Sequence, residues 1–105
     1  MRERLPTRRD ARTTTIEYDN AKWHVSYSLY PDGRVAEVFF RGAKAGSHLA
    51  NTAYAAGVAL SIALQNGASL EEIANACPRN EDEAPADLIG AVCDALLQQV
   101  EDDNG

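Results

Sequence analysis

Residues 34–65 read RVAEVFFRGAKAGSHLANTAYAAGVALSIALQ, and the period of their hydrophobic pattern changes part-way along. In residues 34–41, Ala36, Val38 and Phe40 share one face, which is the two-residue period of a β-strand. Residues 47–65 contain no proline and repeat apolar residues at helical spacing, namely Leu49, Ala53, Ala56, Leu60 and Ala63. The stretch therefore predicts a strand, a glycine-containing loop and a long helix.

Two more strands are predicted upstream of this stretch. Residues 13–19 (TTTIEYD) are rich in β-branched and aromatic residues, and residues 22–30 (KWHVSYSLY) alternate cleanly. Trp23, Val25, Tyr27 and Leu29 would lie on one side, and His24, Ser26, Ser28 and Tyr30 on the other. The following Pro-Asp-Gly at residues 31–33 is typical of a turn, because proline presets φ and glycine accepts a positive φ.

Helices are predicted downstream. Asn66-Gly67 would end the long helix, in which Ala53 and Gly57 would allow another backbone to approach closely. Its polar residues Ser47, Asn51, Ser61 and Gln65 form a narrow stripe. A capping box at residues 69–72 (SLEE) would open a short helix that ends by Cys77-Pro78, and Pro85 would stand in the first turn of a last helix. The prediction is an α+β fold of order β-β-β-α-α-α, a three-stranded antiparallel sheet with helices packed on one of its faces.

Size and composition limit the class of protein. The chain has 105 residues, of which 45% are hydrophobic, and its two cysteines cannot build a disulfide framework. No apolar run reaches the length of a membrane span, and the N-terminus has no apolar segment of a secretory signal. We therefore expect a cytoplasmic protein with a basic arm at residues 1–12, a single domain at 13–100 and an acidic tail at 101–105.

Charge is spread unevenly along the chain. Residues 1–12 carry five arginines against two acids, a net +3, which leaves −9 for the rest of a chain whose total is −6. The basic arm has two interpretations: a solvated extension, or an arm that contacts a phosphate backbone or an acidic partner. The acidic body argues against nucleic acid lying broadly across the domain, because phosphate neutralisation needs clustered lysine and arginine.

Residues for catalysis or metal binding are not evident in the sequence. No serine, cysteine or threonine stands in a recognisable activating context, and His24, His48, Cys77 and Cys93 lack the spacing of a metal site. Cys93 fits the apolar stripe of the last predicted helix, where cysteine behaves as a small hydrophobe. We expect no catalytic residues, no metal and no cofactor.

The loop at residues 42–47 (GAKAGS) is one candidate binding site. Gly42, Lys44, Gly46 and Ser47 supply free backbone N–H groups, a mobile charge and a helix N-terminus, which together can hold an anion such as a phosphate. The spacing is not that of a Walker loop. The alternative is a simple strand-to-helix turn, with glycines for positive φ and Ser47 as the N-cap.

The second face of the predicted sheet is the other candidate. It would present Tyr30, Phe39 and Arg41, and exposed aromatic side chains on a sheet can stack on bases or anchor a protein partner. An ordinary half-solvated face is the alternative. Because the domain is acidic, a protein interface is the favoured functional interpretation.

Residues 37–77 resemble the TSCPD family, a domain found at the C-terminal end of vitamin-B12-dependent ribonucleotide reductases and in small stand-alone proteins. The matching pieces are EVFF at 37–40, G-x-K-A-G-S at 42–47, S-x-x-L-Q-x-G at 61–67, LEEI at 70–73 and PADLIGAVCDAL at 85–96. The five-residue string that names the family is missing, and only Cys77-Pro78 is similar to it. The reductase's catalytic barrel and cobalamin site cannot fit in this length, so the resemblance implies an accessory domain associated with deoxyribonucleotide synthesis.

Two functions from different classes follow from these observations. The first is a non-catalytic module that docks on a ribonucleotide reductase or another protein of nucleotide metabolism, through protein or phosphate contact. The second is a small nucleic-acid-binding module that uses the basic arm and the loop at 42–47. A homodimer is also expected, because the long helix is apolar almost all round.

Overall fold

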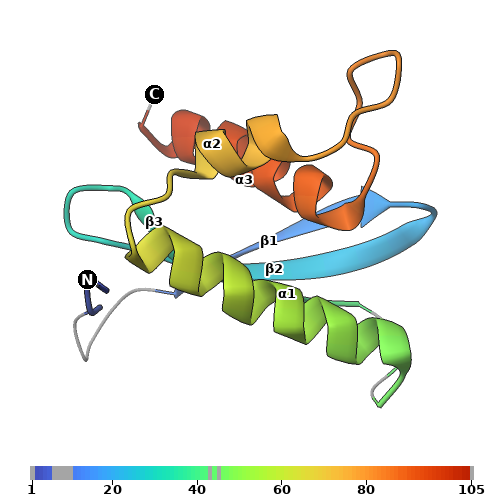
Figure 1. The fold of residues 1–105 in the computed structure, drawn as a ribbon, viewed down its shortest axis with the longest axis horizontal. Coiled ribbons are helices and arrows are strands. Elements are labelled where there is room, and N and C mark those ends of the chain that lie inside the picture. Colours follow the sequence, from blue (N-terminus) through green and yellow to red (C-terminus); the bar gives the residue numbers. More distant parts are fainter. Residues whose placement is uncertain (1, 6–10, 43, 45, 105) are drawn as a thin grey trace. The chain divides into compact units, whose positions relative to one another are not determined.

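The computed structural model describes residues 2–5, 11–42, 44 and 46–104. Three strands, β1 (Ala11–Tyr18), β2 (Ala21–Leu29) and β3 (Val35–Arg41), precede three helices, α1 (His48–Gln65), α2 (Leu70–Ala76) and α3 (Leu88–Asn104) (Figure 1). The predicted α+β order is confirmed. The chain divides into two compact units, Met1–Ala68 with the sheet and α1, and Ser69–Gly105 with α2 and α3.

The sheet is antiparallel in the order β1-β2-β3. Asp19 and Asn20 join β1 to β2 with φ values of 53° and 61°, the left-handed pair that a two-residue hairpin turn requires. In the β2–β3 register, Val25 lies opposite Phe40 and Tyr27 opposite Val38. These four side chains therefore share the face that the alternation predicted, and all are at most 4% exposed.

The outer edge of β3 is closed by side chains of α1. The Val38 N–H donates to Ser61 Oγ at 2.9 Å, and the Ser61 hydroxyl donates to the Val38 carbonyl at 3.0 Å. One turn further along α1, Gln65 Nε2 donates to the Ala36 carbonyl at 2.9 Å. Backbone groups that an edge strand would leave free for another chain are thus paired inside the unit.

The polar stripe noted in the sequence of the long helix is buried at its C-terminal end. Ser61 is 3% exposed and Gln65 is 6% exposed, so neither faces solvent. Their polar atoms replace the missing neighbour strand of β3, which is why two polar residues occur on the buried side of α1.

Gly57 allows α1 to lie this close to β3. A Cβ atom built on Gly57 would stand 3.1 Å from the Val38 carbonyl oxygen and 3.4 Å from Phe39 Cα. The close backbone approach that the Ala53/Gly57 spacing predicted is therefore present at Gly57, one helical turn before Ser61.

The N-terminal residues that the structure describes are attached to the same unit. The Glu3 N–H donates to the Gln65 carbonyl at 2.7 Å, and Arg2 Nε donates to Gln65 Oε1 at 2.5 Å. Glu3 also pairs with Arg34 at 3.1 Å. Arg8 and Arg9 of the predicted arm lie outside the described residues.

In the second unit, α2 begins with the predicted capping box, in which Ser69 Oγ accepts from the Glu72 N–H. The prediction for α3 is wrong at its start, because Pro85 lies in an isolated bridge with Arg79 and the helix begins at Leu88. Asp87 is the capping residue, with its Oδ1 accepting from the Gly90 N–H at 2.9 Å. The helix continues to Asn104, so most of the expected acidic tail is helical.

Arg79 joins the loop after α2 to α3. Its Nη1 and Nη2 donate to the two carboxylate oxygens of Asp94 at 2.5 and 2.8 Å, and Nη2 also donates to the Ala74 carbonyl. The two-pronged geometry is the strongest form of this ion pair, and the Arg79 hydrogen bonds lower the pKa of Asp94. Val92, Cys93 and Leu96 of α3 are fully buried.

Ser61→Ala should destabilise the protein by about 1–3 kcal/mol. The substitution leaves the buried N–H and C=O groups of Val38 without a hydrogen-bond partner. Urea unfolding followed by circular dichroism measures this loss. Thr52→Ala is the control, since Thr52 is exposed on the same helix and its replacement should change the free energy of unfolding by less than about 0.5 kcal/mol. Equal stability of the two variants would contradict the edge-closing role of Ser61.

Candidate functional site

The loop before α1 has clear structural reasons for its glycines and its serine. A Cβ atom on Gly42 would lie 2.5 Å from the Lys22 carbonyl oxygen, and Gly46 has a φ of 80°. Ser47 is the N-cap of α1, and its Oγ accepts from the Ala50 N–H at 3.1 Å. Lys44 is exposed, and residues 43 and 45 lie outside the described residues. Anion binding by this loop stays a prediction.

The structure separates the three residues predicted for a partner interface. Tyr30 is only 3% exposed, its hydroxyl donates to the Glu3 carbonyl at 2.7 Å, and the Arg34 guanidinium lies 4.7 Å from the centre of its ring. Arg41 is exposed and Phe39 is half-buried at the other end of the sheet face. Tyr30 therefore offers almost no surface to a partner, whereas Phe39 and Arg41 do.

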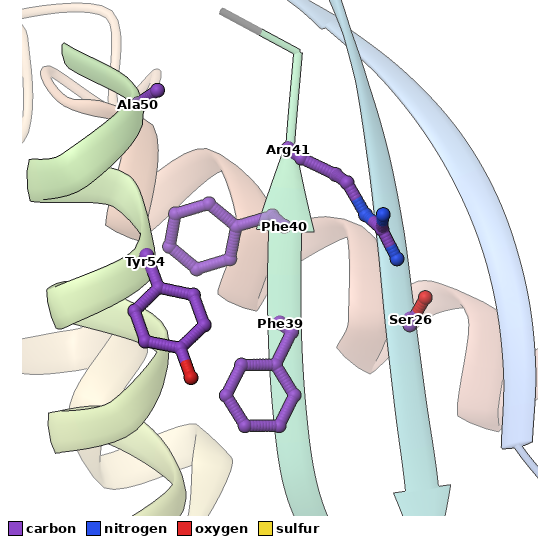
Figure 2. Close-up of a pocket in the computed structure, with 6 residues that line it drawn as sticks. All are labelled: Ser26, Phe39, Phe40, Arg41, Ala50 and Tyr54. Carbon is purple, nitrogen blue, oxygen red and sulfur yellow. The ribbon is translucent and has the colours of Figure 1, made fainter. Parts of the chain in front are cut away.

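Phe39 and Arg41 line a hollow of about 440 Å³ between β3 and the N-terminal half of α1. We call this the aromatic hollow; its lining residues are Ser26, Phe39, Phe40, Arg41, Ala50 and Tyr54. The Phe39 and Tyr54 rings stack with centroids 6.0 Å apart and planes at 24° (Figure 2). Figure 2 also shows the Arg41 side chain extending toward β2, the strand that carries Ser26.

Tyr54 is the member of this site that the sequence analysis missed. It precedes Gly57 by three residues, and Gly57 contacts Val38 and Phe39, so Tyr54 is brought to the same strand one turn earlier along α1. The spacing between Tyr54 and Gly57 was the available signal, but it becomes informative only when the strand that Gly57 approaches is known.

The chemistry of the aromatic hollow suits contact with another macromolecule. Tyr54 is 66% exposed although its ring is held by Phe39, so it presents a large amphipathic surface at low cost in conformational entropy. The Arg41 guanidinium can donate to a carboxylate or a backbone carbonyl. Tyrosine and arginine are the residue types enriched among the strongest contributors to protein interfaces.

The cysteines lie in an environment that disfavours reaction. Burial raises the pKa of the Cys93 thiol to about 12 and raises that of Cys77 above its ordinary value. A nucleophilic cysteine needs the opposite shift, because the thiolate is the reactive form.

Metal ligands do not gather among the described residues. Within the part of the chain that the structure describes, no three His, Cys, Asp or Glu side chains lie where they could hold a metal ion. No helix among these residues is long and apolar enough to cross a membrane.

Comparison with protein families adds a finding that agrees with this fold. The model of the TSCPD domain matches residues 2–99, nearly the whole chain. The chain belongs to the TSCPD domain family. The resemblance noted in the loop and helices is thereby confirmed, although the string that names the family is reduced here to Cys77-Pro78.

The similar curated proteins are all vitamin B12-dependent ribonucleotide reductases. The chain is 42% identical to that of Rhodopirellula baltica over 74 residues and 38% identical to that of Streptantibioticus cattleyicolor over 71 residues. These segments cover 70% and 68% of this TSCPD chain but only 7% and 12% of the reductases. No solved structure matches the chain.

Gly42→Ala should cost the TSCPD chain roughly 2 kcal/mol or more, because the added methyl group meets the Lys22 backbone and the strand or loop must shift. Gly46→Ala should cost about 1 kcal/mol, since its Cβ would enter open space and only the positive φ is strained. Thermal unfolding of the two variants, with Lys44→Ala as the control, measures which substitution lowers stability more. A Gly42→Ala protein as stable as Lys44→Ala would show that the glycine is not required by packing.

Proposed function

We propose that this chain is a non-catalytic accessory domain that docks on a ribonucleotide reductase, or on another protein of nucleotide metabolism, in the cytoplasm. Support comes from its relatives, which are vitamin B12-dependent ribonucleotide reductases and which share only a small segment with it. Its role would then belong to deoxyribonucleotide synthesis without carrying out the reduction.

The aromatic hollow is the observation that carries this proposal. A tyrosine that is 66% exposed and stacked on Phe39, in a hollow that an exposed arginine also lines, is the kind of surface that a partner's side chain fills. The hollow is formed within one unit, by neighbouring parts of β2, β3 and α1. It is therefore held by the same hydrogen bonds that fix α1 against β3.

A non-catalytic role agrees with the chemistry of the described residues. The two thiols are held in the protonated form, and Arg79 and Asp94 satisfy each other in an ion pair. The loop residues Gly42, Lys44, Gly46 and Ser47 are proposed as an additional phosphate contact, because the exposed Lys44 lies just before the N-terminus of α1.

Phe39→Ala, Tyr54→Ala and Arg41→Ala should each weaken binding to the partner by about tenfold or more, as loss of a central interface residue does. The measurement is biolayer interferometry of the immobilised chain against the purified vitamin B12-dependent ribonucleotide reductase of the same host. Leu49→Ala is the matched control, because Leu49 is an exposed apolar residue of α1 outside the hollow, and the affinity of this variant should equal that of the unaltered chain.

A companion co-purification from the host, with and without nuclease, identifies the partner class. Enrichment of a reductase or another nucleotide-metabolism protein in both samples supports docking. Partners that disappear on nuclease treatment would support the nucleic-acid alternative instead. Full binding by all three hollow variants would contradict the proposed docking surface.

A further inference from the structure

The exposed large hydrophobic side chains of the described residues all belong to one helix. They are Leu49, Tyr54 and Ile62 of α1, which are 54%, 66% and 42% exposed. Ala55 and Ala59, on the same outward side as Ile62, are also exposed. A helix with one face against a sheet ordinarily presents charged residues to water on the other face, and α1 does not.

Charged residues are missing from α1 altogether. The 18 residues from His48 to Gln65 contain no Asp, Glu, Lys or Arg, in a chain where those types make up 25%. The buried side of the helix is already used by β3, where Ser61 and Gln65 bond the strand edge. The unit therefore does not use the uncharged outward side for its own packing.

The shape of the outward side fits helix–helix packing. Tyr54, Val58 and Ile62 follow one another at intervals of four, which makes them a ridge along the helix. Ala55 and Ala59 stand beside the ridge and leave a shallow groove. A ridge next to a groove on the same helix can pack into a second copy of itself.

We propose that two copies of this chain associate through the outward face of α1, with the helices antiparallel across a two-fold axis at Val58. In that arrangement Tyr54 of each copy faces Ile62 of the other, and the ridge of one helix lies in the alanine groove of its partner. The dimer face and the docking surface share Tyr54, but docking also needs Phe39 and Arg41, which belong to β3 and lie outside the dimer face.

Charge favours a second copy over a different partner. Each chain carries −6, so two copies repel on average, and a face without charge lets them meet without placing like charges together. A two-fold interface sets every residue near its own counterpart, so a neutral face suits this symmetry. An acidic or basic partner would instead select a face with complementary charges.

The size of the face sets the expected strength. An 18-residue helix is about 27 Å long and presents a strip about 10 Å wide, so the two copies bury about 540 Å² in total, well below the roughly 1,200 Å² of a stable interface. The dimer should therefore be a weak, transient one, with a dissociation constant on the order of 100 μM.

Sedimentation velocity of the full chain over a concentration series tests the proposal. We expect a monomer–dimer equilibrium whose affinity falls about tenfold or more in Ala59→Glu, which places a like charge on each side of the contact. Ala76→Glu on α2 is the matched control, because Ala76 is another exposed helical alanine and the same charge is added there. Both variants should keep the wild-type circular dichroism spectrum, since alanine and glutamate are both strong helix formers.

Salt provides an independent readout. Raising NaCl from about 50 mM to about 500 mM should leave the dimer unchanged or strengthen it, because salt screens the repulsion between two acidic chains. A chain that stays monomeric at all concentrations, a dimer equally weakened by Ala76→Glu, or a dimer that dissociates in salt would each overturn the proposal. If the monomer nevertheless binds the reductase through Phe39 and Tyr54, the docking function survives and only the dimer is lost.

Discussion

The paired hydrogen bonds between Ser61 and Val38 fix the relation of α1 to the sheet. A three-stranded sheet ends in edges whose backbone groups attract other chains, and here one edge is closed by a serine and a glutamine of the unit's own helix. Gly57 favours this close approach, because a Cβ atom at that position would stand 3.1 Å from the Val38 carbonyl oxygen, tighter than an ordinary contact. Once α1 is held at this distance, the positions of its other side chains follow from helical geometry alone.

Both surfaces that we assign to binding are consequences of that placement. One turn before Gly57, Tyr54 is brought against Phe39, and the rings form one wall of the aromatic hollow. On the side away from β3, the same helix carries the uncharged ridge through Val58 and Ile62. The two surfaces adjoin at Tyr54, so a partner in the hollow and a second copy on the ridge would both contact this ring.

Much of the fold was predictable from the sequence, because alternation and capping are local signals. The strand pattern in residues 22–30 and the capping box at Ser69 gave elements that the structure contains. Long-range contacts decided the rest: Ser61 and Gln65 resemble a solvent-facing stripe until the strand edge beside them is known, and Tyr30 resembles an exposed residue until Glu3 and Arg34 cover it. The prediction that the last helix starts at Pro85 was wrong because Asp87, two residues later, offers a side-chain cap that proline lacks.

The account depends most directly on the closed edge of β3, and hydrogen exchange of the Val38 amide tests it. This N–H points away from β2 and toward Ser61, so an open edge would let it exchange as fast as the amides of exposed loops. We predict that it exchanges as slowly as the amides paired between β2 and β3, and that Ser61→Ala selectively speeds it. Rapid exchange of Val38 in the unaltered protein would contradict the closed edge, and with it the placement of Tyr54 and the ridge.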